Sequence, residues 1–129
     1  MKNEVRYMLL LFGVLVSAGC SQKHNEVSNE VSFVKDVMPI LKENCLSCHS
    51  KNGEGFLASG FSVESYESIM KGTKYGPVIQ PGESYASTML VLVDHKADPS
   101  INMPRSAPKL SVENIKMIGD WISQGAKNI

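Results

Sequence analysis

The sequence lacks an excess of charge of either sign and a long apolar run. Its 129 residues include 13 basic and 13 acidic side chains, so the formal net charge is zero. This balance provides no broad basic surface, and nucleic-acid binding is not expected. The apolar run from Tyr7 to Val16 is well short of the ~20 residues that a transmembrane helix needs.

The sequence also lacks the alternation of apolar and polar residues that marks a half-buried strand, and it contains no internal repeat. Apolar residues recur at helical spacing instead, in four segments: 32–41, 63–70, 84–93 and 111–125. We therefore predict an all-α fold, with Ser32, Ser84 and Ser111 as N-caps.

Single residues refine this prediction. Phe33, Val34, Val37, Ile40 and Leu41 form the apolar side of the first helical segment, and Val112, Ile115, Ile118, Trp121 and Ile122 form that of the last. Pro39 should kink the first segment or divide it. The glycines at 53, 55 and 60 predict a loop over residues 51–60.

The N-terminus has the pattern of an export signal. Lys2 and Arg6 precede the apolar run, and small residues at 17–19 follow it. Cys20 comes next, which resembles the lipobox of bacterial lipoproteins, although Ser17 departs from the usual aliphatic residue. We predict a signal peptide over 1–19, a lipid anchor at Cys20 within a flexible tether over 20–31, and one domain over 32–129. A plain secretory peptide with a free Cys20 is the alternative.

The most informative motif is Cys45-Leu46-Ser47-Cys48-His49, which has the spacing of c-type haem attachment. On one helical turn, residues three and four apart share a face, so the two thiols and the imidazole point the same way. Two thioethers can then hold the porphyrin edge while His49 reaches the iron. The motif predicts one covalently bound haem c, with Cys45 and Cys48 as attachment sites and His49 as an iron ligand.

Three other interpretations compete with haem attachment. A redox dithiol of the thioredoxin type follows a strand, whereas a helical pattern precedes Cys45. A zinc site needs four ligands, and the rest of the chain offers only Cys20, His24 and His95. The third interpretation is coincidence. Three cysteines in an exported protein fit a haem pair plus one lipid anchor.

The proline-rich segment 99–108 is the expected source of a sixth iron ligand. Pro104 favours an extended Met103, so a loop can present the thioether, a soft ligand that suits low-spin haem iron. The alternative is that Met103 only fills a gap in the core. His95 is the second candidate, although a lone histidine at a helix end is more often solvated. The competing methionines lie too near the motif or fit helical patterns: Met38, Met70, Met89 and Met117.

Several motifs in sequence order resemble one known family. They are Cys45 to His49, Gly76-Pro77-Val78-Ile79-Gln80-Pro81-Gly82, Asn102-Met103-Pro104, Leu110-Ser111, Trp121-Ile122 and Gly125-Ala126. Together they resemble the planctomycete-type cytochrome c domain, a small mono-haem relative of class I cytochromes c, across roughly residues 33–126. The resemblance implies a class I-like fold in which the first and last helices pack beside the haem. It also implies His49 as the proximal ligand, Met103 as the distal ligand, and electron transfer.

These observations predict an electron carrier rather than an enzyme, with haem c and its iron as cofactors. The expected partners are redox proteins, not identified by the sequence, and a bacterial membrane reached through the anchor at Cys20. The protein is expected to be exported and to face the periplasm or the cell exterior, and no small-molecule substrate is evident. Two alternatives are a haem enzyme or gas sensor with a displaceable sixth ligand, and a non-haem dithiol module.

Overall fold

The computed structural model of the chain describes residues 30–105 and 107–129. The predicted signal peptide, Cys20, His24 and most of the predicted tether lie outside these residues. None of the helices in the described part of the chain is both long enough and apolar enough to span a bilayer.

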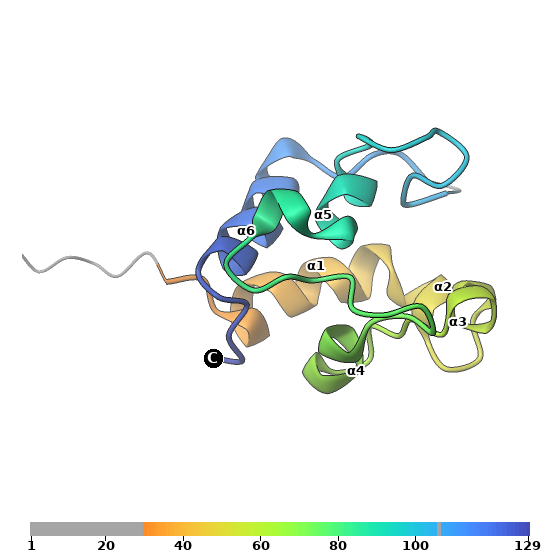
Figure 1. The fold of residues 1–129 in the computed structure, drawn as a ribbon, viewed down its shortest axis with the longest axis horizontal. Coiled ribbons are helices and arrows are strands. Elements are labelled where there is room, and N and C mark those ends of the chain that lie inside the picture. Colours follow the sequence, from red (N-terminus) through yellow and green to blue (C-terminus); the bar gives the residue numbers. More distant parts are fainter. Residues whose placement is uncertain (1–29, 106) are drawn as a thin grey trace, which may run out of the picture.

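Within the described residues the chain is helical (Figure 1). The elements in chain order are η1 (Phe33–Val37), α1 (Met38–Asn44), α2 (Leu46–His49), α3 (Glu54–Ser59), α4 (Tyr66–Lys71), η2 (Ser84–Ala86), α5 (Thr88–Val93) and α6 (Val112–Ser123). Extended pairing in this part of the chain amounts to one isolated bridge between Thr73 and Gly76. The all-α prediction is confirmed.

The first helical segment is divided, as Pro39 predicted. Ser32 caps it by accepting a hydrogen bond from the backbone N–H of Lys35. The chain then winds as a π-helical turn, η1, and continues as α1, which carries Pro39 in its first turn, where the missing N–H costs no helical hydrogen bond. The predicted apolar side is buried except at Val34, which is 61% exposed, so that assignment was wrong.

Two predictions for the middle of the chain were wrong. Residues 51–60 are not all loop, because α3 lies within them. The segment 84–93 is not one helix capped by Ser84, because η2 is followed by Ser87, whose buried hydroxyl donates to the carbonyl of Glu83 and accepts from the N–H of Gln80. These bonds hold the connection before α5, so the helix begins only after them.

The helix predicted over 63–70 is present as α4, but it starts three residues later than expected. Its capping box pairs the side chains and backbone N–H groups of Ser65 and Ser68, and it ends at Gly72, which has a positive φ of 80°. The local capping chemistry therefore sets the first turn, and the apolar Val63 packs into the core before the helix begins.

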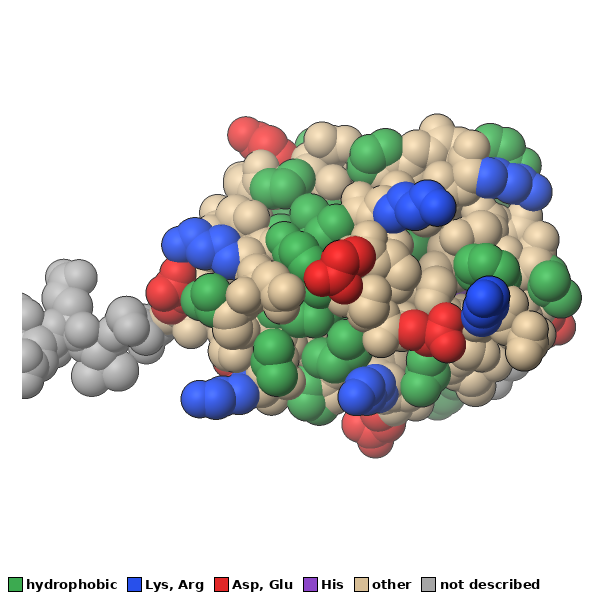
Figure 2. All heavy atoms as spheres, turned by 90° about the horizontal axis from the view of Figure 1, so that it is seen from below, with side chains coloured by type: hydrophobic (Ala, Val, Ile, Leu, Met, Phe, Trp, Pro, Cys, Tyr) green, Lys and Arg blue, Asp and Glu red, His purple; other side chains and the backbone are tan. Residues whose placement is uncertain are grey.

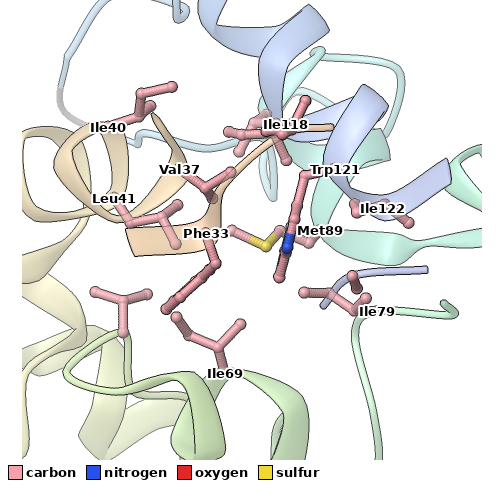
Figure 3. Close-up of a cluster of buried hydrophobic side chains, with 14 of the residues drawn as sticks. Phe33, Val37, Ile40, Leu41, Ile69, Ile79, Met89, Ile118, Trp121 and Ile122 are labelled. Carbon is pink, nitrogen blue, oxygen red and sulfur yellow. The ribbon is translucent and has the colours of Figure 1, made fainter. Parts of the chain in front are cut away.

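The core lies where η1, α1 and α6 meet, and side chains from α4, α5 and residue 79 complete it (Figure 3). Ser111 caps α6, as predicted, and Ile118, Trp121 and Ile122 are buried on its inner face. The predicted apolar position Val112 is instead 76% exposed. The ring of Phe33 lies 5.2 Å from that of Trp121, which joins the first and last helical segments.

The two ends of the described domain meet. The N–H of Val34 and the hydroxyl of Ser32 both donate to the carbonyl of Ile129, and Lys127 forms an ion pair with Glu30. Figure 1 shows these ends on the side of the molecule away from α2 and α3. The Cys45-to-His49 segment thus lies at the opposite end of the domain from Glu30 and Ile129, the two ends of the described residues.

Candidate haem site

The predicted attachment motif forms a turn of helix directly after α1. The carbonyl of Cys45 accepts hydrogen bonds from the N–H of Cys48, at 3.2 Å, and from the N–H of His49, at 2.9 Å. Cys45 and Cys48 are free thiols and are partly exposed. The two sulfur atoms and the imidazole therefore come from a single turn, as the spacing predicted.

The orientation of His49 is set by a residue from the next part of the chain. Nδ1 of His49 lies 3.1 Å from the backbone carbonyl of Phe61, and the two rings meet edge to face with centroids 5.4 Å apart. A carbonyl can only accept, so the neutral imidazole carries its proton on Nδ1 and its lone pair on Nε2. This is the tautomer that a histidine needs to bind a metal through Nε2.

Two glycines let α3 pack against the motif. A Cβ on Gly55 would lie 2.8 Å from Cε1 and 3.0 Å from Nδ1 of His49, and one on Gly53 would overlap the carbonyl of Cys48. From the sequence, these glycines were expected to be loop residues. Their role is close approach to the histidine and to the backbone of the motif, and only the folded arrangement reveals it.

The thiols do not resemble those of a redox dithiol. Burial, together with the neighbouring Cys48, raises the pKa of Cys45 to about 11, whereas catalytic dithiols depend on a lowered thiol pKa. Within the described residues, no group of three or more His, Cys, Asp and Glu side chains could hold a metal ion by itself. Neither the dithiol nor the zinc interpretation gains support from this part of the molecule.

Met103 lies in the loop between α5 and α6, as predicted, and its backbone is held on the loop's inner side. Its N–H donates to the carbonyl of Leu92 at 3.1 Å, and its side chain is half-buried against the core. The preceding Asn102 pairs its side-chain amide with the N–H and the carbonyl of Ala97. The peptide bond from Met103 to Pro104 is cis.

His95, the other candidate for the sixth ligand, is exposed and follows α5 with a positive φ of 54°. Its Nε2 lies 3.0 Å from the backbone carbonyl of Met103. The carbonyl accepts, so Nε2 of His95 is the donor of this bond. The structure thus brings the two candidates into contact with each other.

The residues present fit a haem. The donor set comprises two thiols, an imidazole in the metal-binding tautomer and, in the loop after α5, a thioether. Partly buried apolar side chains, Met103 among them, pack against the core around its margin: Met38, Leu46, Tyr66, Met70, Val78, Leu90, Met103, Ile115 and Met117. Figure 1 shows α2, α3 and the loop after α5 on the side of the domain away from the C-terminus.

The surface charge is mixed on the face shown in Figure 2. Hydrophobic side chains gather there in a broad patch, with basic and acidic side chains interspersed around it. Neither sign of charge forms a continuous area on this face, in agreement with the balanced composition.

The described residues form an all-helical domain in which a single helical turn carries two free thiols and an oriented histidine. The family model for planctomycete cytochrome C matches residues 45–106, a little under half of the chain. This segment, which runs from the first cysteine of the motif through Met103, is similar to that family. No curated protein and no solved structure matches the chain.

Proposed function

We propose that this protein is a mono-haem c-type cytochrome that carries electrons, with the haem attached through thioethers at Cys45 and Cys48. The observation that carries the proposal is the contact between His49 and Phe61, which leaves Nε2 of His49 with the lone pair that a metal requires, on the same turn as both thiols. The family match over residues 45–106 supports it. When bound, haem supplies an iron that alternates between the ferric and ferrous states.

Met103 is the proposed distal ligand. Its thioether is half-buried at the core margin, whereas the ring of His95 is exposed and uses Nε2 to donate to the carbonyl of Met103. Bis-histidine ligation through Nε2 would require that bond to break. With haem bound, His49 and Met103 would hold the iron, and the protein would need to keep water from it and leave a porphyrin edge accessible to a redox partner.

The N-terminal sequence supports export and membrane attachment. Residues 1–19 are the proposed signal peptide, and Cys20 is the proposed lipidation site, with residues 20–31 as the tether. Lipidation with more than one acyl chain would give a stable attachment. The domain would then face the periplasm or the cell exterior and exchange electrons with redox proteins there.

Absorption spectra of the purified ferrous protein, with and without carbon monoxide, test this proposal. A His/Met cytochrome should show the c-type spectrum and little change with carbon monoxide, because both axial positions are filled. A large spectral change would instead indicate a haem enzyme or gas sensor with an open or displaceable site. The protein should be produced in cells that attach haem to a control cytochrome c. If it then shows no haem absorption, the haem proposal fails and the non-haem dithiol module is the remaining alternative.

A further inference from the structure

We propose that His95 is a positioning residue that holds Met103 in place as the iron ligand. The inference rests on the proposed ligation by Met103. It assigns to His95 a role distinct from the two roles considered from sequence, direct ligation and solvation. The proposal stands on the hydrogen bond from Nε2 of His95 to the carbonyl of Met103, at 3.0 Å.

The N–H and the carbonyl of Met103 are both hydrogen-bonded to residues at the end of α5. Its N–H is bound to the carbonyl of Leu92, at the end of α5, and its carbonyl is bound to the ring of His95. The backbone from which the thioether extends is therefore held at both its N–H and its carbonyl. A thioether binds iron weakly compared with an imidazole, so a ligand of this kind depends on being held near the metal.

The backbone of His95 adopts a conformation that aims the ring at the loop. Its φ of 54° is in the left-handed region, which non-glycine residues seldom occupy, and the turn is closed by a hydrogen bond from the N–H of Lys96 to the carbonyl of Val91. This positive φ belongs to the cap that ends α5, because the N–H of His95 also donates to the carbonyl of Leu92. The cap holds His95 at the helix end, from which its ring reaches the carbonyl of Met103, eight residues along the chain.

Substitutions that keep the backbone strain equal isolate the hydrogen bond. His95→Gln retains an N–H donor on a side chain of similar reach, whereas His95→Leu has a similar size and no donor. Both place a non-glycine residue at the same positive φ. His95→Gly relieves the strain and removes the donor, so it serves if the leucine variant folds poorly. Ser100→Ala, which removes a hydrogen bond to Asp98 in the same loop, is the control.

The readouts are the weak far-red sulfur-to-iron absorption band of the ferric protein and carbon monoxide binding by the ferrous protein. We expect His95→Leu and His95→Gly to lose part of the band and to bind carbon monoxide roughly three- to tenfold more tightly, the scale of one hydrogen bond. His95→Gln and Ser100→Ala should behave like the wild type. An unchanged band and unchanged carbon monoxide affinity in both donor-free variants would overturn the positioning role.

The same spectra separate this inference from the proposed ligation. If the wild type lacks the far-red band and Met103→Ala alters neither readout, Met103 is not the ligand, and the positioning role is overturned with it. If the wild type shows the band, Met103→Ala abolishes it and His95→Gly does not affect it, the ligation stands and only the role of His95 fails.

Discussion

The backbone carbonyl of Phe61 lies 3.1 Å from Nδ1 of His49, twelve residues earlier in the chain, and the rings of these two residues pack edge to face. One residue thus sets both the tautomer and the orientation of the imidazole. A second hydrogen bond, from the N–H of Val63 to the carbonyl of His49 at 3.0 Å, joins the segment that contains Phe61 to the backbone of the motif. The proximal side of the proposed site is therefore held in place by contacts within the chain.

The close packing of Gly55 against His49 gives the first prediction. Gly55→Ala should lower the unfolding free energy of the holoprotein by ~1–3 kcal/mol, because the added Cβ would lie 2.8 Å from Cε1 of a ring that Phe61 holds in place. Denaturant titration followed by circular dichroism measures this change, and the absorption spectrum should report a disturbed proximal ligand.

Gly119→Ala in α6 is the matched control. A Cβ there would meet Leu90 at 3.5 Å, an ordinary contact, so the substitution should raise the unfolding free energy by roughly 0.5–1 kcal/mol through helix propensity. If Gly55→Ala were as stabilising as Gly119→Ala and left the spectrum intact, α3 would not constrain the histidine.

The starts of the first and last helical segments and the attachment turn could be predicted from sequence because short-range chemistry decides them. Ser32 and Ser111 cap their helices, and the turn from Cys45 to His49 follows from spacing alone. The helix α3 could not be predicted, because its glycines are present for contact with residues of the motif and not for a turn. In the sequence, Gly53 and Gly55 look the same whether they form a turn or allow close packing.

The partners of His49 and His95 could not be predicted either. The bond from His49 to Phe61 and the bond from His95 to Met103 both end on backbone carbonyls, and a carbonyl is present at every residue. No side-chain identity marks such an acceptor in the sequence. The proline-rich loop did indicate that Met103 leaves the helical pattern, which the structure confirms.

The join between the first and last helical segments gives the second prediction. Trp121 is 1% exposed, packs against Phe33 and donates through Nε1 to the carbonyl of Lys127 at 2.9 Å. Trp121→Phe should lower the unfolding free energy by ~1–3 kcal/mol, since it leaves a smaller ring and an unpaired carbonyl. Val112→Ala, at a position 76% exposed, should change it by less than ~0.5 kcal/mol in the same denaturation assay.

The proposed distal ligand gives the third prediction. Met103→Ala should abolish the far-red sulfur-to-iron band, allow carbon monoxide to bind and lower the reduction potential, because the thioether favours ferrous iron. Helical circular dichroism should be retained, since the loop prolines still restrict the chain. If His95→Ala produced these changes and Met103→Ala did not, bis-histidine ligation would replace the His/Met assignment.

The N-terminal motif gives the fourth prediction, which concerns the full-length protein in cells. Cys20→Ser should release mature protein into the soluble fraction or leave an unprocessed precursor, because the lipid anchor cannot form. Immunoblots of membrane and soluble fractions measure the distribution. Ser21→Ala, one residue along, should leave it unchanged. Equal membrane partitioning of Cys20→Ser and wild type would show that Cys20 is not the tether.

Covalent attachment at Cys45 and Cys48 is the central claim, and the mass of the denatured protein tests it most directly. The protein should be produced in cells that attach haem to exported cytochromes and then analysed after acid and organic-solvent extraction. We predict the mass of the processed chain plus one haem for wild type, and the loss of that covalent addition in the Cys45→Ser, Cys48→Ser double variant. A wild-type mass without haem, with any haem recovered in the organic phase, would contradict the claim.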